Sequence, residues 1–170
     1  MAGRPQRVLF VHHGTGMGGA PQLLLKYLLH LDRDAYAPVV WCIRRSSASE
    51  LFESHGIEVV YDENVVPFLH ISDGFYGIAR PHIVARMLWG QVRSYRAARR
   101  MFAELRPDVI HVNSVVLPGV LKAARTYGRP VAVNILECVS PGYTGLRRWW
   151  LRSLTKRCAD IFVFMLPSEM

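Results

Sequence analysis

A glycine-rich segment is the part of this sequence best suited to bind an anion. Residues 14–20 read Gly-Thr-Gly-Met-Gly-Gly-Ala and stand between an apolar run and a helical pattern. Backbone N–H groups in such a segment, together with the start of the following helix, can receive a phosphate or another anion. Gly14, Gly16 and Gly19 also satisfy the pattern G-x-G-x-x-G, which occurs as well in strand-to-helix turns that bind nothing.

A dinucleotide site would need a second feature, an acidic residue at the end of the second strand that accepts the ribose hydroxyls. The sequence has Ile43-Arg44-Arg45-Ser46 at that point. Arginines there favour a nucleotide with a 2′-phosphate, so an NADP-binding oxidoreductase domain is the alternative function. The two histidines before Gly14 depart from the usual tight turn of such a site.

Polar residues also end the fourth expected strand. His111, Asn113 and Ser114 are candidate substrate contacts, because ligands of open α/β sheets bind beyond the carboxyl ends of the strands. His111 has an alternative place in the core, bonded to a backbone carbonyl. His12 and His13 point to opposite faces of a strand and cannot hold one metal ion together without further ligands. We therefore predict no metal site and no cofactor.

A basic helix near the end of the sequence predicts a surface for anions. Residues 86–170 carry 14 Lys and Arg against 5 Asp and Glu, whereas residues 1–85 carry 7 against 8. Cations beside tryptophans are typical of helices on anionic lipid interfaces, although a solvated basic face with buried tryptophans has the same composition. A basic module for a membrane surface or nucleic acid is thus the third candidate function, and nucleic acid is not expected because no recognised motif accompanies the charge. The predicted membrane or anion surface consists of Arg147, Arg148, Trp149, Trp150, Arg152, Lys156 and Arg157.

Short apolar runs alternate with helical patterns along the chain. This alternation predicts an α/β fold, a doubly wound, mostly parallel, Rossmann-like sheet of about six strands with helices on both faces. Residues 62–80 interrupt the rhythm and are predicted to form a loop with apolar anchors. The clearest amphipathic pattern, at 81–105, puts Leu88 and Phe102 on the apolar face. We expect strands at 7–13, 38–43, 57–61, 108–113, 131–135 and 160–164, and helices at 21–31, 48–55, 81–105, 118–127 and 146–158.

The composition indicates one globular domain over residues 1–170, since 51% of the residues are hydrophobic and 20% are charged. Cys42, Cys138 and Cys158 lack C-x-x-C spacing, so buried, reduced thiols of a cytosolic protein are expected. No signal-length apolar segment opens the sequence, and no run reaches the roughly 18 apolar residues of a spanning helix. We predict a cytoplasmic protein whose basic surface allows peripheral attachment at the inner face of the membrane.

Four short segments occur in an order that one enzyme family shares. Gly18-Gly19-Ala20 ends the loop after the first strand, Asp-Val-Ile-His stands at 108–111, a Pro-led strand follows at 129–133, and Ala159-Asp160 and Ser168-Glu169 flank the last strand. With this order and spacing the chain resembles the N-terminal half of glycosyltransferase family 4 enzymes, which have the GT-B fold. The resemblance extends across nearly the whole chain.

The resemblance implies roles for particular residues. In the family the glycine-rich loop lies over the donor's diphosphate and the acceptor, which makes three glycines candidate substrate contacts: Gly16, Gly18 and Gly19. Glu137 matches an acidic residue that some members have after the fifth strand, and it is the candidate catalytic residue. The sequence departs from the family at Pro21, where a Glu is frequent, and at Leu136, where many members have a catalytic histidine.

The resemblance also implies partners. The family's donor-binding residues belong to a C-terminal domain that this sequence lacks, so we expect an acceptor-side half that is inactive alone. In the complete enzyme the two halves would close on a nucleotide sugar and an acceptor. The other half would come from a longer chain or from a separate subunit, and the surface exposed without it predicts a concentration-dependent homodimer.

Overall fold

Six parallel strands form one sheet in the computed structural model, which describes residues 4–68, 81–136, 139 and 145–164. The strand order is β3-β2-β1-β4-β5-β6, that of the Rossmann fold. The expected doubly wound α/β sheet is therefore confirmed. The strands are β1 (Gln6–His12), β2 (Tyr36–Cys42), β3 (Glu58–Tyr61), β4 (Val109–Val112), β5 (Val131–Ile135) and β6 (Ile161–Phe164).

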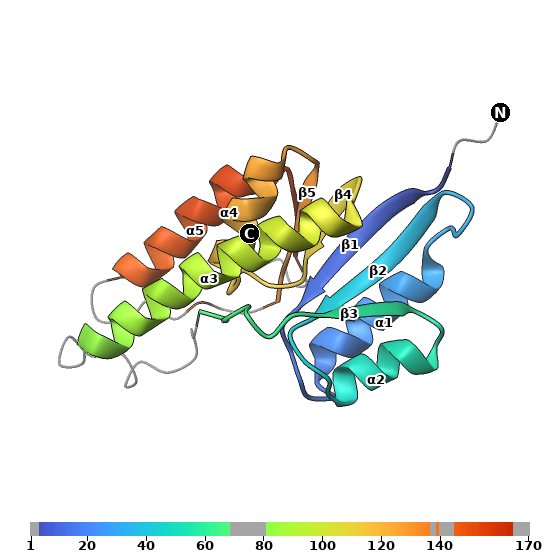
Figure 1. Cartoon of the computed structure of the whole chain (residues 1–170), viewed down its shortest axis with the longest axis horizontal. Coiled ribbons are helices and arrows are strands. Elements are labelled where there is room, and N and C mark those ends of the chain that lie inside the picture. Colours follow the sequence, from blue (N-terminus) through green and yellow to red (C-terminus); the bar gives the residue numbers. More distant parts are fainter. Residues whose placement is uncertain (1–3, 69–80, 137–138, 140–144, 165–170) are drawn as a thin grey trace.

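The helices form two layers, one on each face of the sheet (Figure 1). On one face lie α1 (Gly19–His30) and α2 (Ser47–Ser54), and on the other lie α3 (Pro81–Leu105), α4 (Pro118–Tyr127) and α5 (Leu146–Cys158). Right-handed crossovers produce this arrangement, because the direction in which strands are added reverses at β1. The bounds of α3, α4, α5 and β5 equal those expected from the sequence, and the other elements differ by one or two residues.

Helix α1 begins inside the glycine-rich segment. The sequence predicts Pro21 at the first helical position, but the helix starts at Gly19 with Gly18 as its N-cap, so this expectation is wrong by two residues. A proline at the third position is tolerated, because the first four N–H groups of a helix have no intrahelical partner. The first turn of α1 is therefore continuous with the glycine-rich turn.

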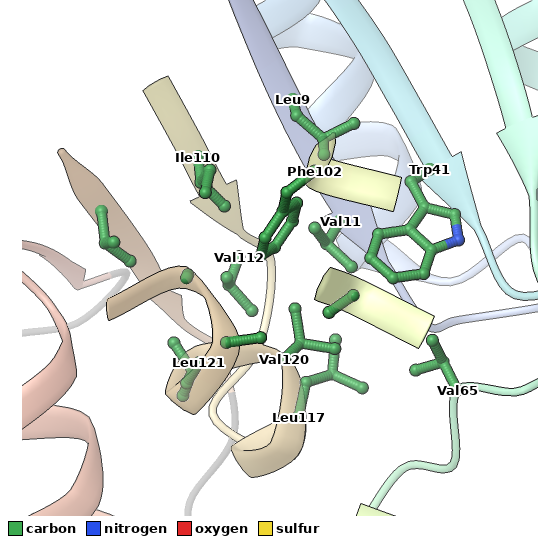
Figure 2. Packing of buried hydrophobic residues seen from close by; sticks show 14 of the residues in the cluster. Leu9, Val11, Trp41, Val65, Phe102, Ile110, Val112, Leu117, Val120 and Leu121 are labelled. Atoms are coloured by element: carbon green, nitrogen blue, oxygen red, sulfur yellow. The ribbon is translucent and has the colours of Figure 1, made fainter. Parts of the chain in front are cut away.

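Alternate residues of the strands supply two hydrophobic clusters, one on each face. The larger lies under α3 and α4, where the rings of Trp41 and Phe102 meet edge to face at 6.3 Å between centroids (Figure 2). The smaller lies under α1 and α2 and includes Phe10, Leu24 and Phe52. Burial on both faces is the usual condition of a parallel sheet.

A close contact between α3 and α4 holds the second layer together. A Cβ at Gly119 would lie 2.4 Å from the backbone oxygen of Gln91, so only glycine permits this approach. The Gln91 side chain accepts a hydrogen bond from Gly119 N and donates one to the carbonyl of Val66. Val65 and Phe68 are buried, which confirms apolar anchors in the described part of the predicted loop.

The N-terminal half of α3 corrects one expectation. Leu88, placed on the apolar face by its spacing, is 49% exposed, and its neighbours Trp89 and Val92 are exposed as well. This part of α3 extends past the sheet in Figure 1, so the amphipathic pattern continues where there is no core to cover. Among the described residues no helix is both long and apolar enough to span a membrane.

Two of the three cysteines lie within the described residues. Cys42 and Cys158 are buried free thiols, as predicted, and Cys138 lies outside the described residues. Burial raises the pKa of Cys42 to about 12, so this thiol stays protonated. Burial also raises the pKa of Cys158, so neither thiol has the thiolate character that a reactive cysteine needs.

Candidate functional site

The glycine-rich turn lies at the carboxyl end of β1, beside the position where the strand order reverses. Ligands of doubly wound sheets bind at this position. Residues 15–19 are exposed, and a Cβ added to Gly16, Gly18 or Gly19 would meet nothing within 4 Å. The α1 N-terminus has no side-chain cap and no acidic residue in its first turn. The turn thus offers uncapped N–H groups and open space to an anion.

The neighbouring strand β2 adds positive charge to the same rim. Arg44 and Arg45 follow β2 and are exposed, and the Arg45 guanidinium stands over the Tyr61 ring at 5.6 Å. The Ser47 hydroxyl, at the start of α2, donates to the carbonyl of Thr15 at 3.1 Å. This hydrogen bond connects the first turn of α2 to the glycine-rich turn.

A row of buried polar side chains crosses the sheet below this turn. The row consists of His12 on β1, Asn113 just after β4 and Asn134 on β5. Each of them directly follows a valine, and these valines pair with one another across the sheet: Val11, Val112 and Val133. Asn134 Nδ2 donates to Asn113 Oδ1 at 2.8 Å, and Asn113 Nδ2 lies 3.0 Å from His12 Nδ1. All three residues are 0% exposed. We call these residues the polar row.

Burial keeps two histidines of this region neutral. Desolvation, with a smaller contribution from His13, lowers the pKa of His12 from 6.5 to about 4. Desolvation also lowers the pKa of His111 to about 4, against an opposing interaction with Asn134. The side chains of His111 and Asn134 do not meet in hydrogen-bonding geometry, since neither His111 Nε2 nor Asn134 Oδ1 has a hydrogen-bond partner among the described residues.

The two histidines lie on the face of the sheet that α1 and α2 cover. The His12 ring meets Phe52 of α2 edge-on at 5.7 Å, and the His111 ring lies 5.0 Å from Phe10 and 6.5 Å from Tyr27 of α1. His111 thus packs among aromatic rings, in line with its alternative place in the core, although it bonds no described carbonyl. Its role as a substrate contact stays a prediction.

Of the other predicted site residues, Asn113 and Ser114 lie inside the fold and Glu137 is not described by the structure. Asn113 and Ser114 are fully buried, and the Ser114 hydroxyl accepts a hydrogen bond from Val116 N at 3.0 Å. In this conformation both side chains support the carboxyl edge from within, and a direct contact with substrate stays a prediction. Glu137 lies outside the described residues. No group of three or more metal-binding side chains gathers within the described ranges.

Sequence reasoning missed His12 and Asn134 as members of the site. Their signal is a polar residue at or just beyond the carboxyl end of a mainly apolar strand, which occurs at β1, β4 and β5 alike. Without the register of the strands, this repeated position could not be connected to a single row.

The basic helix α5 presents part of its predicted surface to solvent. Trp149 is 62% exposed, whereas Trp150 packs against Phe68 with 5.3 Å between ring centroids, so the two tryptophans have different environments. Arg147 is half-buried and Leu146 is 62% exposed. A shallow groove of about 420 Å³ runs along the helix, lined by Gly145, Arg148, Trp149, Arg152, Ser153 and Lys156.

No family model and no curated protein matches the sequence. Solved structures share its fold. MurG from Acinetobacter baumannii aligns with 98% of this chain at 17% identity, with a TM-score of 0.64 and 43% of MurG covered. HepE from Anabaena, solved with UDP and glucose, aligns with 92% at 19% identity, with a TM-score of 0.58 and 37% of HepE covered. The UDP-GlcNAc 2-epimerase of Neisseria meningitidis, bound to UDP-GlcNAc, aligns with 94% at 15% identity, with a TM-score of 0.55 and 40% covered.

This chain thus spans about two fifths of the length of the solved structures that it matches. At these identities the likeness establishes the fold and leaves the chemistry open, since one fold hosts many activities. The chain has the Rossmann-like α/β fold of one part of GT-B-type proteins, among them glycosyltransferases and an epimerase of nucleotide sugars.

Proposed function

We propose that the chain is the acceptor-side half of a GT-B glycosyltransferase, which transfers a sugar from a nucleotide sugar and needs a donor-binding partner. One observation carries this proposal: an open, uncapped glycine-rich turn at the strand-order reversal of a sheet whose structural neighbours include UDP-bound proteins. The turn would contact the diphosphate of the nucleotide sugar through backbone N–H groups. Membership of glycosyltransferase family 4 and a catalytic Glu137 belong to the same proposal.

Binding of UDP tests whether the turn receives a diphosphate. A half-site should bind at millimolar concentration, roughly 4 kcal/mol of binding. Titration of the ¹⁵N-labelled chain with UDP should shift the backbone amide signals of residues 14–19. Gly18→Trp should abolish these shifts without loss of stability, because a Cβ at Gly18 meets nothing within 4 Å.

Asp34→Trp is the matched control, since Asp34 is exposed at the amino-terminal edge of β2. This variant should respond to UDP as the unaltered chain does. Amide shifts scattered over the surface, or an unchanged response of Gly18→Trp, would count against a diphosphate at the turn.

An assay of sugar transfer tests whether the chain needs a donor-binding half for activity. One half can supply acceptor contacts and backbone donors but no complete transition-state site, so the chain alone should transfer no sugar from a panel of nucleotide sugars. Addition of a donor-binding half, supplied as a separate polypeptide, should restore transfer. Turnover by residues 1–170 alone, above that of Gly19→Trp, would overturn the half-enzyme proposal.

An NADP-binding oxidoreductase domain is the second candidate. The strand order is that of dinucleotide-binding Rossmann folds, and the exposed Arg44 and Arg45 follow β2 where a 2′-phosphate would lie. The lack of an acidic residue at the end of β2 and the UDP-bound neighbours favour the glycosyltransferase proposal over this one.

We also propose that the chain attaches peripherally to anionic membranes, which would place it at the inner face of the cytoplasmic membrane. The groove on α5 combines Arg148, Arg152 and Lys156 with an exposed Trp149. Trp89 of α3 is a second exposed aromatic residue, and α3 and α5 cover the same face of the sheet (Figure 1). Each cation near such a surface contributes about 1 kcal/mol, so several together suffice for reversible binding.

Sedimentation with liposomes tests this attachment. The chain should pellet with vesicles of anionic lipid at low salt and stay in the supernatant with neutral vesicles or at raised salt. The double variant Arg148→Glu/Arg152→Glu should bind at least about thirtyfold more weakly, since it removes two contributions of about 1 kcal/mol and adds two charges that the anionic surface repels. Lys26→Glu, an exposed change on α1 across the sheet, should bind as the unaltered chain does. Equal recovery in every supernatant would reject the attachment.

A further inference from the structure

The hydrogen bonds of the polar row determine which nitrogen of His12 carries the proton. Asn134 Nδ2 donates to Asn113 Oδ1, so the amide nitrogen of Asn113 faces His12 Nδ1 at 3.0 Å. An amide NH₂ group only donates, and a neutral imidazole has one acceptor nitrogen and one N–H. His12 Nδ1 therefore accepts, and His12 Nε2 carries the hydrogen.

This Nε2–H group lies beneath the glycine-rich turn. His12 is 0% exposed, and its Nε2 has no hydrogen-bond partner among the described residues. A Cβ on Gly14 would lie 2.9 Å from His12 Nε2 and 3.1 Å from its Cε1, so residue 14 approaches the donor this closely only because it is glycine. Buried donors without a partner are costly and uncommon. A ligand oxygen can become the partner of this donor when the backbone at Gly14 moves aside.

The surroundings of the donor favour an anion. Nε2 lies next to Gly14, four residues before the uncapped N-terminus of α1, whose first turn contains no acidic residue. The helix dipole and the free N–H groups there attract negative charge. Arg44 and Arg45 stand at the end of β2, and β2 pairs directly with β1.

We propose that His12 Nε2–H is a hydrogen-bond donor for an oxyanion bound at the glycine-rich turn, with Asn113 and Asn134 as positioning residues that hold its tautomer. The inference rests on the proposed function, which puts a diphosphate at this turn, and it adds a buried side-chain donor. Gly14 covers Nε2 in this structure, so binding requires the turn to move at Gly14. The row of amides polarises the imidazole toward donation.

Two substitutions change the donor in opposite ways. Asn113→Asp presents a carboxylate oxygen to His12 Nδ1, which draws the proton to Nδ1 and leaves Nε2 as an acceptor that repels an oxyanion. His12→Gln retains an amide N–H near the position of Nε2 and should rescue binding relative to His12→Phe. Trp41→Phe is the matched control, because Trp41 is equally buried near the same edge of the sheet but stands outside the polar row.

The probe is inorganic pyrophosphate, titrated into the full chain and its variants at neutral pH. We expect the ring nitrogens of His12, observed by ¹⁵N NMR, to show the Nε2–H tautomer in the free chain and a shift of Nε2 on binding. Pyrophosphate should bind about tenfold more weakly to His12→Phe and Asn113→Asp, and unchanged to Trp41→Phe. Urea midpoints of all variants separate lost folding from lost binding.

Three results would overturn the inference. An Nδ1–H tautomer in the free chain contradicts the direction of the hydrogen bonds. Equal affinity of folded His12→Phe and the unaltered chain, with amide shifts at 14–19 in both, removes His12 from the site and leaves the proposed function intact. A turn that responds neither to pyrophosphate nor to UDP in any variant removes both.

Discussion

Mild acid should destabilise the folded chain, because the buried His12 and the partly buried His111 are held as neutral rings. Their pKa of about 4 lies below the ordinary value of 6.5, so the unfolded chain takes up their protons first. The full stability is present above pH 6.5 and is lost as the pH falls from 6.5 toward 4. At pH 5 each histidine should cost about 2 kcal/mol, and the pair about 4 kcal/mol, while most carboxylates are still ionised.

A loss of this size is a large part of the stability of an ordinary domain, which is about 5–15 kcal/mol. Urea unfolding, followed by far-UV circular dichroism at intervals from pH 7.5 to pH 4.5, measures it. Between pH 6 and pH 5 the slope should approach two protons taken up on unfolding, and above pH 7 the contribution of both rings should vanish.

Two variants, one at a partly buried histidine and one at an exposed histidine, separate the effect of burial from other effects of low pH on stability. His111→Phe places an apolar ring beside Phe10 and Tyr27 and should remove about half of the loss at pH 5. His30→Gln changes an exposed histidine and should leave the loss as it is. A free energy of unfolding that stays level from pH 7 to pH 5, or a slope that His111→Phe does not reduce, would refute the reasoning.

Three further outcomes are expected. Gly119→Ala should lower the urea unfolding free energy by about 1–3 kcal/mol, since its Cβ meets the Gln91 carbonyl, and Gly16→Ala, which meets nothing, should change it by much less. Trp41→Phe should lower the urea unfolding free energy by no more than about 1 kcal/mol. The variant loses some packing, but it also removes a buried indole N–H that has no described partner. A loss of about 3 kcal/mol would show that this N–H is hydrogen-bonded. Calorimetric titration with NADPH should give no dissociation constant as low as the micromolar range, roughly 8 kcal/mol of binding, and such a value would favour the oxidoreductase alternative.

The sequence predicts the order of strands and helices well because each strand is an unbroken apolar run between turn residues. Such runs arise when both faces of a strand are buried, which the two hydrophobic clusters confirm. Strand ends are less certain, because polar residues such as His12 and His13 do not mark where strand pairing stops: the strand expected to end at His13 ends at His12. The exposure of Leu88 and Trp89 shows the limit of periodicity, since a helical pattern does not reveal where the neighbouring layer ends.

The candidate site is predicted only in part, for a physical reason. Gly16 and Gly18 lie within one short segment of the sequence, and a turn after the first strand of a βα unit lies at the carboxyl edge by geometry alone. The polar row depends on the register of three strands, so that His12, Asn113 and Asn134 meet only after the sheet is assembled. A side chain buried by tertiary contacts cannot be distinguished from an exposed one by its place in the sequence.

Two of the residues that carry the family resemblance are accounted for by the fold itself. The Asp108 carboxylate accepts a hydrogen bond from Arg7 N at 2.9 Å while Asp108 N donates to the Arg7 carbonyl, and Asp160 makes the same reciprocal pair with Val131. Each aspartate extends the ladder at the amino-terminal edge, the edge opposite the glycine-rich turn. A parallel sheet needs such anchors whether or not it binds a sugar nucleotide, so these two matches support the fold and say nothing of chemistry. The evidence for function therefore rests on the opposite edge, where the uncapped start of α1, the buried His12 ring and the exposed Arg44 lie at the carboxyl ends of β1 and β2.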